Sequence, residues 1–215
     1  MVEHVYRRAE RARHVEAVVV ATDDERVATA VDEFGGTAVL TDPDHATGTD
    51  RLAEVAASLD SELIVNVQGD EPLITGQAID LAIEPCLRRP EELMSTLRRR
   101  IEDPTELANP SVVKVVVDRQ GYALYFSRAG VPYTRPEAAA PALWRHLGLY
   151  VYRRPFLLML AGLAQTPLEQ AEGLEQLRVL EHGIKILTVE TTVDTIGVDT
   201  PEDLERVRRL VGVGR

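Results

Sequence analysis

The chain has 215 residues, of which 45% are apolar, which is enough to bury a substantial core and argues against global disorder. The formal net charge of -11 argues against a broad nucleic-acid or anionic-membrane surface, because both need a positive face. A single cysteine, Cys86, excludes an internal disulfide and a cysteine-based zinc cluster. The N-terminus is charged and no apolar run is long enough to cross a bilayer, so we expect a soluble cytoplasmic protein.

The first half of the chain alternates helical and strand patterns. Thr22 and Glu25 have the spacing of a capping box at the start of the second helix, and two glycines end that helix. The run at 15–21 is continuously apolar, as in strands buried within a parallel sheet. This alternation predicts an α/β fold. Helices are predicted over 2–13, 22–34, 51–59 and 76–88, and strands over 15–21, 37–40 and 62–67.

The middle of the chain has four strand-like runs with few helices between them. Residues 118–121 have the composition of a hairpin turn, so antiparallel strands are expected to extend the sheet. Residues 134–142 are rich in Pro and Ala and predict a flexible excursion. Thr166 and Thr200 each precede a proline and an acidic residue, which is the pattern of a helix start, and a late strand lies between them.

The segment NVQGDEP, at 66–72, follows a predicted buried strand and places Asp70 and Glu71 at its carboxyl end. Ligands of open α/β sheets bind at that edge, and a carboxylate there suits Mg²⁺, which takes one or two carboxylates together with phosphate oxygens. The alternative is that both acids only shape a turn and a helix start. A second acidic strand end, with Asp194 and Asp199, offers a partner carboxylate, unless Asp199 only begins a helix.

Common nucleotide motifs are absent. The chain has neither a GxxxxGK[ST] loop nor a GxGxxG fingerprint, which disfavours kinases, ATPases and Rossmann dehydrogenases. The loop HATGTDR, at 45–51, offers backbone and side-chain donors, although such a loop often only turns the chain.

Several segments occur in one order along the chain: ATDDERV, TGTDRLAEV, NVQGDEP, NPSVVKVV, GYALYFSRA, RHLGLYVYR, LEQLRVLEHG and GVDTPEDLERV. This series resembles the 3-deoxy-manno-octulosonate cytidylyltransferases (CMP-Kdo synthetases) from about residue 2 to about residue 207. The resemblance implies a three-layer α/β fold of the nucleotide-diphospho-sugar transferase type (Rossmann-like), with a mixed, mostly parallel sheet and an antiparallel extension. It also implies one domain over 1–215, with a sugar-binding and dimerisation subregion at about 93–180, and a homodimer.

The resemblance implies transfer of CMP from CTP to 3-deoxy-D-manno-octulosonate (Kdo), giving CMP-Kdo and pyrophosphate for lipopolysaccharide synthesis. Mg²⁺ is the expected cofactor, and Asp70 and Asp199 resemble its catalytic ligands. CTP and Kdo are the expected substrates, with no nucleic acid or membrane partner. The residues that resemble nucleotide contacts are Thr47, Gly48, Thr49, Arg51 and Gln68. Those that resemble sugar contacts are Arg128 (for the Kdo carboxylate), His146, Tyr150, Glu175 and Gln176.

Each of these residues also has an ordinary structural reading. Arg128 would then form a surface ion pair, His146 and Tyr150 would be core residues, and Glu175 and Gln176 would lie on a solvated helix face. Lys114 matches a family position, but an exposed strand lysine explains it equally well.

The chain departs from the family at two places. The family begins with an apolar strand and a basic triphosphate-binding loop, whereas Met1 stands where the next helix begins. We expect a start codon assigned downstream of the true one, the alternative being a real truncation that leaves activity in question. Arg98 to Arg100 replace a segment that is more apolar in the family, and the sequence offers no functional explanation for these arginines.

Two other functions remain open: a cytidylyltransferase for another acidic sugar such as sialic acid, and an inactive binding or assembly module.

Overall fold

The computed structural model describes residues 1–45, 47–135, 141–198 and 200–212. Helices and strands alternate along the first half, as the sequence predicts. The helices are α1 (Val2–Ala9), α2 (Glu25–Glu33), α3 (Gly48–Ala57), α4 (Gly76–Arg88), α5 (Pro104–Ala108), α6 (Arg154–Ala161), α7 (Pro167–Glu172), α8 (Gln176–Glu181) and α9 (Pro201–Gly212). The strands are β1 (Val20–Thr22), β2 (Ala38–Leu40), β3 (Leu63–Asn66), β4 (Met94–Arg100), β5 (Lys114–Val117), β6 (Ala123–Ser127), β7 (Trp144–Arg153) and β8 (Leu187–Glu190).

The main sheet has six strands and is mixed. Its path is β6-β5-β7-β4-β8, and β3 also pairs with β7. Strands β3, β4, β5 and β8 run in one direction, whereas β6 and β7 run against them. Because β7 lies beside three of the co-directional strands, most hydrogen-bonded pairs are antiparallel, and β4 with β8 is a parallel pair. The mixed α/β architecture is therefore confirmed: most strands of the sheet run in one direction, as expected, but the antiparallel pairing involves the inner strand β7 as well as the β5–β6 extension.

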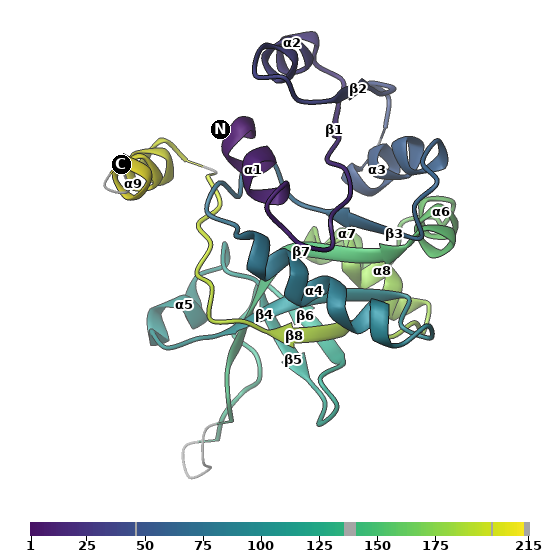
Figure 1. The fold of residues 1–215 in the computed structure, drawn as a ribbon. Helices are drawn as coiled ribbons and strands as arrows, with labels where there is room; N and C mark the ends of the chain where they lie inside the picture. The colour runs from purple at the N-terminus through teal and green to yellow at the C-terminus, as the bar shows by residue number, and fades with distance from the viewer. Residues whose placement is uncertain (46, 136–140, 199, 213–215) are drawn as a thin grey trace.

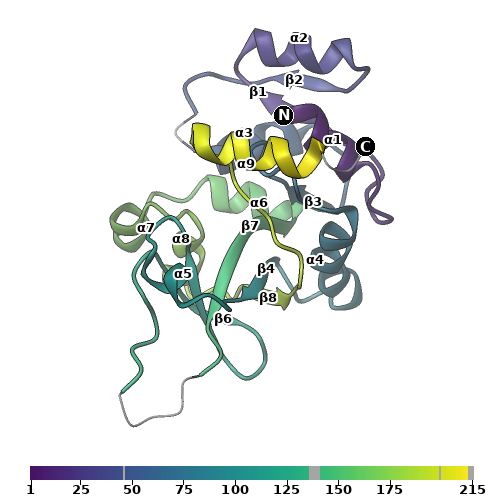
Figure 2. The same ribbon diagram turned by 90° about the vertical axis from the view of Figure 1, so that its left-hand side faces the viewer.

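Helices cover both faces of this sheet, which gives the three layers (Figures 1 and 2). Helices α1 and α4 pack on one face, with a core that includes Val5, Ile79 and Val151. Helices α3, α6 and α8 pack on the other, with a core that includes Phe126 and Tyr152. Val151 and Tyr152 are neighbours in β7 but face opposite cores, as the alternation of side chains along a strand requires.

The N-terminal region differs from the prediction. The strand expected over 15–21 covers only Val20–Thr22, is mostly half-buried, and pairs with β2 in a separate parallel two-stranded sheet. Among the described strands β1 has this single partner, so the preceding apolar residues stay outside any sheet; Val15 and Val18 pack against the α4 core instead. Asp24, rather than Thr22, caps α2 by accepting a hydrogen bond from Arg26 N at 2.8 Å.

Other local predictions are confirmed. Helix α4 spans 76–88 as expected, and Gly121 closes the β5–β6 hairpin with φ at 91°. At the start of α7, Thr166 N donates to the Glu169 carboxylate at 3.1 Å, which is the glutamate half of the expected capping box. Thr200 receives a hydrogen bond from Asp203 N at 3.2 Å at the start of α9. The excursion predicted over 134–142 lies largely outside the described residues.

The last helix, α9, lies apart from the six-stranded sheet, near α1 in both views (Figures 1 and 2). Within the described part of the chain, no helix is long and apolar enough to cross a membrane.

Candidate active site

A cavity of about 730 Å³ opens along one edge of β7. It arises because β3 and β5 pair with the same edge of β7 at different heights: Asn66 lies opposite Tyr150, and Lys114 lies opposite Arg145. Between these pairings, residues 147–149 have no strand partner on that edge within the described residues. The cavity thus lies at a split in the sheet.

The backbone of β7 is irregular at the same height. Thr96 of β4 is opposite Tyr150 and the next residue, Leu97, is opposite Leu147, so β7 carries two additional residues, Gly148 and Leu149. Such bulges commonly occur beside functional sites, where they redirect side chains. Predicted site residues from distant parts of the chain converge here. Those that line the cavity are Gly48, Thr49, Gln68, Arg128, His146, Tyr150, Glu175 and Gln176.

The start of α3 forms one wall. Thr47 caps the helix: its hydroxyl accepts from Asp50 N at 3.2 Å and donates to the Asp50 carboxylate at 2.9 Å. Gly48 and Thr49 therefore begin the helix, where backbone N–H groups that lack a partner within the helix favour anionic or acceptor groups. Thr47 itself does not line the cavity and acts as a structural cap.

Arg51 lies outside the cavity and joins three elements. Its guanidinium donates to the Thr41 hydroxyl after β2 and pairs with Asp23 after β1 at 3.0 Å. The structure thus separates Arg51 from Thr49, although both belong to the same predicted nucleotide loop. Arg51 holds the carboxyl ends of β1 and β2 against α3.

The opposite wall contains Arg128, which is exposed and held by backbone carbonyl groups rather than by a surface ion pair. Its Nε donates to Glu172 O at 2.8 Å, and its terminal nitrogens donate to Pro110 O at 3.2 Å and Gly173 O at 3.5 Å. A guanidinium carries five N–H donors, so the contacts with described residues leave two terminal N–H groups, the number that a carboxylate accepts in a bidentate pair.

His146 is buried beneath the cavity. Its Nε2 lies 2.9 Å from the Thr96 hydroxyl, which itself donates to Leu149 O at 2.7 Å. A hydroxyl has one hydrogen, so we assign the Nε2 proton to His146, which donates to Thr96. Burial, followed by the charge of Arg145, lowers the pKa of His146 to about 3, so its imidazole is neutral at physiological pH.

An aromatic row follows β7 through the site. Ring centroids are 5.3 Å apart for His146 and Tyr150, and 5.9 Å apart for Tyr150 and Tyr152. Burial raises the pKa of both tyrosine hydroxyls, so they remain neutral. The aromatic row supplies a rigid face with polar groups at its edge, which suits a polyhydroxylated ligand. The same rings pack against the core. His146 and Tyr150 can therefore be core residues and sugar contacts at the same time.

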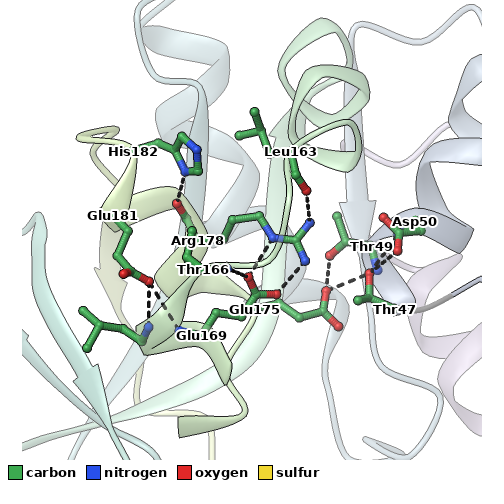
Figure 3. Close-up of polar contacts among 11 residues, drawn as sticks. Thr47, Thr49, Asp50, Leu163, Thr166, Glu169, Glu175, Arg178, Glu181 and His182 are labelled. Atoms are coloured by element: carbon green, nitrogen blue, oxygen red, sulfur yellow. Dashed lines mark hydrogen bonds and ion pairs between the residues drawn. The ribbon is translucent and has the colours of Figure 1, made fainter. Parts of the chain in front are cut away.

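Glu175 connects the two walls (Figure 3). Its carboxylate accepts from the Thr49 backbone N–H at 3.3 Å and from the Thr49 hydroxyl. Glu175 lies just before α8, and Gln176 begins it. The predicted sugar helix and the predicted nucleotide loop are therefore in direct contact.

A buried ion pair supports α8 (Figure 3). Arg178 donates to both Glu169 oxygens, at 2.8 and 2.5 Å, and to Leu163 O at 3.2 Å. The side chains of the pair are 3% and 4% exposed. Burial acts to raise the pKa of Glu169, but the hydrogen bonds from Arg178 and Thr166 outweigh it and lower the pKa. Sequence reasoning missed this pair, because a helical Arg and Glu are usually exposed.

The two predicted metal ligands lie on segments that meet. Val198 N donates to Asp70 O at 2.9 Å, which brings the residue before Asp199 against the Asp70 loop. Asp199 itself lies outside the described residues. The described part of the chain has no group of three or more His, Cys, Asp or Glu side chains suited to a metal. The one or two carboxylates expected from Asp70 and Asp199 would fit Mg²⁺, because this ion completes its coordination shell with water and phosphate oxygens.

Comparison with known proteins identifies the family. The cytidylyltransferase family model matches residues 1–186. The 3-deoxy-manno-octulosonate cytidylyltransferase of Solibacter usitatus is 53% identical over 98% of this chain and 83% of its own length. The enzyme of the same name from Geotalea uraniireducens is 55% identical over 96% of this chain and 86% of its own length.

The chain belongs to the 3-deoxy-manno-octulosonate cytidylyltransferase family.

Solved structures agree with this membership. A CMP:2-keto-3-deoxy-manno-octonic acid synthetase, solved in complex with CTP, is 43% identical with a TM-score of 0.94 and covers 100% of this chain and 88% of its own. The 4-diphosphocytidyl-2C-methyl-D-erythritol synthase of Anaerococcus prevotii shares the fold, with a TM-score of 0.64 at 14% identity, over 98% of this chain and 88% of its own.

Two further charged residues that line the cavity of this cytidylyltransferase, Glu106 and Arg145, were not predicted from the sequence. Arg145 pairs with Glu106 at 3.3 Å and with Asp194 at 3.5 Å, and Arg99 approaches the same two carboxylates. Asp194 is thus paired with arginines. Arg98 donates to Thr188 O at 2.6 Å and stacks 4.8 Å from the Trp144 ring, so Arg98 and Arg99 have structural partners.

Proposed function

We propose that this protein transfers CMP from CTP to Kdo, giving CMP-Kdo and pyrophosphate. One observation carries the proposal: a single cavity brings the start of α3 to face the wall that contains Arg128 and His146. This arrangement suits a nucleotide at α3 and an acidic sugar at Arg128. It occurs in a chain whose relatives of more than 50% identity are named for this activity.

The side chains would act by positioning the two substrates. Arg128 would pair its two remaining terminal N–H groups with the sugar carboxylate, and the neutral His146 and Tyr150 would contact sugar hydroxyls. The α3 N-terminus and Gln68 would hold the nucleotide. Fixing the anomeric hydroxyl beside the α-phosphate of CTP removes much of the entropic cost of the bimolecular step.

Asp70 and Asp199 would hold Mg²⁺; in support, the hydrogen bond from Val198 N to Asp70 O joins the Asp70 loop to the segment that precedes Asp199 in the sequence. Mg²⁺, when bound, supplies charge neutralisation at the phosphate and the leaving pyrophosphate. The half-buried Asp70 would keep the charge of Mg²⁺ at the mouth of the sheet.

We also propose a cytoplasmic location, since CTP is a cytoplasmic metabolite. A homodimer is proposed on the sequence resemblance alone. Fractionation and light scattering after size exclusion check these two points.

Pyrophosphate release from Mg-CTP, measured with and without Kdo, tests the reaction. Release that requires Kdo supports it. In competition, a clear preference for sialic acid over Kdo would show that the sugar assignment is wrong. Binding of both substrates without turnover would favour the inactive binding module.

A further inference from the structure

Lys114 is fully buried at the start of β5, against the expectation of an exposed strand lysine. Its Nζ donates to Asn109 O at 2.9 Å, to Val112 O at 2.6 Å and to Arg128 O at 2.5 Å. An ammonium group has three hydrogens, so these three carbonyl groups satisfy it completely. A buried charge is costly, which makes so specific an arrangement informative.

Glu172, at the end of α7, holds the same region from the other side. Its two carboxylate oxygens accept from the Ser127 hydroxyl at 2.6 Å and from Arg128 N at 2.9 Å, and its carbonyl accepts from Arg128 Nε at 2.8 Å. Burial acts to raise the pKa of Glu172, but the hydrogen bonds from Ser127 and Arg128 outweigh it and lower the pKa. Glu172 is therefore ionised at neutral pH.

Neither Lys114 nor Glu172 lines the cavity, yet each contacts segments that do. The cavity wall here consists of the loop at 109–113, Arg128, and the segment 173–176 that leads into α8. Lys114 ties the loop to Arg128, and Glu172 ties Arg128 to the end of α7. Arg128 completes the link by donating to Pro110 O in the loop and Gly173 O after α7.

We propose that Lys114 and Glu172 are positioning residues that fix the direction of the Arg128 guanidinium and thereby set affinity for the carboxylate of the acidic sugar. This role rests on the proposed function, since it takes Arg128 as the carboxylate partner. The contacts of Lys114 and Glu172 with Arg128 involve neither Thr49 nor Glu175. They therefore act on the sugar side of the cavity and leave the α3 wall in place.

The first test compares Lys114→Met with Lys185→Met. Lys114 and Lys185 are the lysines of the chain, and Lys185 is exposed, so it is a matched control. Calorimetry measures binding of Kdo and of CTP separately. We expect Lys114→Met to weaken Kdo binding about tenfold, the effect of losing a buried charged donor. The affinity of Lys114→Met for CTP should stay within about twofold of the wild-type value. Lys185→Met should change the affinity for neither substrate.

Glu172→Gln provides a second variant in case Lys114→Met does not fold, with the exposed Glu91→Gln as its control. Glu172→Gln keeps the shape and one acceptor oxygen, so we expect a smaller loss of Kdo affinity, with CTP affinity again unchanged. Equal loss of both affinities in a folded variant would show a general structural role and overturn the proposal. Unchanged Kdo affinity would overturn it as well.

A signal from Lys114 itself gives an independent readout. In protein labelled with ¹⁵N at lysine Nζ, the Lys114 resonance should shift when Kdo binds, whereas the Lys185 resonance should not. A Kdo complex that leaves the Lys114 resonance unchanged would contradict the link to Arg128. Wild-type protein that binds CTP but no acidic sugar would overturn the proposed function and this role together, whereas Kdo binding unaffected by either substitution would overturn the positioning role alone.

Discussion

Thr49 and Glu175 are 126 residues apart in the sequence, yet the Thr49 backbone N–H donates to the Glu175 carboxylate at 3.3 Å (Figure 3). The contact joins the first turn of α3 to the segment before α8. It places a negative charge at a helix N-terminus, where the helix dipole favours it. The two walls of the cavity are thus held together by one side chain.

Glu175→Ala should therefore weaken binding of both CTP and Kdo, by about three- to tenfold each, because Thr49 loses its acceptor and the walls lose their link. Calorimetry with each substrate measures this, and Glu190→Gln on the exposed end of β8 is the control. A loss confined to Kdo would indicate that Glu175 contacts the sugar without connecting the walls.

Arg178→Met should lower the free energy of unfolding by about 3–5 kcal/mol, because it leaves the Glu169 carboxylate buried without its partner. Arg208→Met is the matched control, since the Arg208–Glu205 pair is exposed and such pairs contribute about 0–1 kcal/mol. Urea unfolding followed by circular dichroism measures both variants. Similar values for the two would contradict the special role of the buried pair.

His146 should make the protein less stable in mild acid. The folded protein takes up a proton on His146 only near pH 3, whereas in the unfolded chain this occurs near the ordinary value of 6.5. The contribution of His146 to the free energy of unfolding is therefore complete above pH 6.5. Between pH 6.5 and pH 3 it falls by about 1.4 kcal/mol for each unit by which the pH drops. His146→Gln should flatten the stability profile between pH 6 and 4, relative to the exposed His4→Gln control. An unchanged slope would show that His146 does not carry this dependence.

Asp70→Asn should abolish turnover while changing stability by less than about 1 kcal/mol, since the substitution keeps the shape but removes the charge proposed to hold Mg²⁺. Pyrophosphate release at increasing Mg²⁺ measures the first effect and thermal unfolding the second. Asp60→Asn, at an exposed site, is the control. Unaltered Mg²⁺-dependent release in Asp70→Asn would remove Asp70 from the metal site.

Arg128→Ala should weaken Kdo at least about tenfold more than CTP, because a paired carboxylate loses a charge-assisted, bidentate partner. Titration of each substrate checks this, with Arg119→Ala in the exposed hairpin turn as the control. If both substrates lose affinity equally, the substitution has disturbed the fold of the wall instead of a carboxylate contact.

Local sequence signals predicted most elements of the fold. Helix α4, the β5–β6 hairpin and the helix start at Thr166 depend on hydrogen bonds between residues a few positions apart, so short patterns identify them. The strand predicted over 15–21 was wrong in extent, because a strand needs a neighbour and β1 has only β2 among the described strands.

Residue patterns alone were enough to predict the family, the order of elements and the residue types that can bind a nucleotide and an acidic sugar. Which of these residues share a cavity became clear from the three-dimensional fold: Thr49 lines it, whereas Arg51, two residues later, joins β1 and β2 to α3. The fold also revealed Lys114 and the Arg178–Glu169 pair as buried. The partners of these charges lie only 2 to 15 residues away along the chain, but the turns between elements bring them around the charge. No periodic pattern of residue types records how those turns fold back, so burial of a charge could not be predicted.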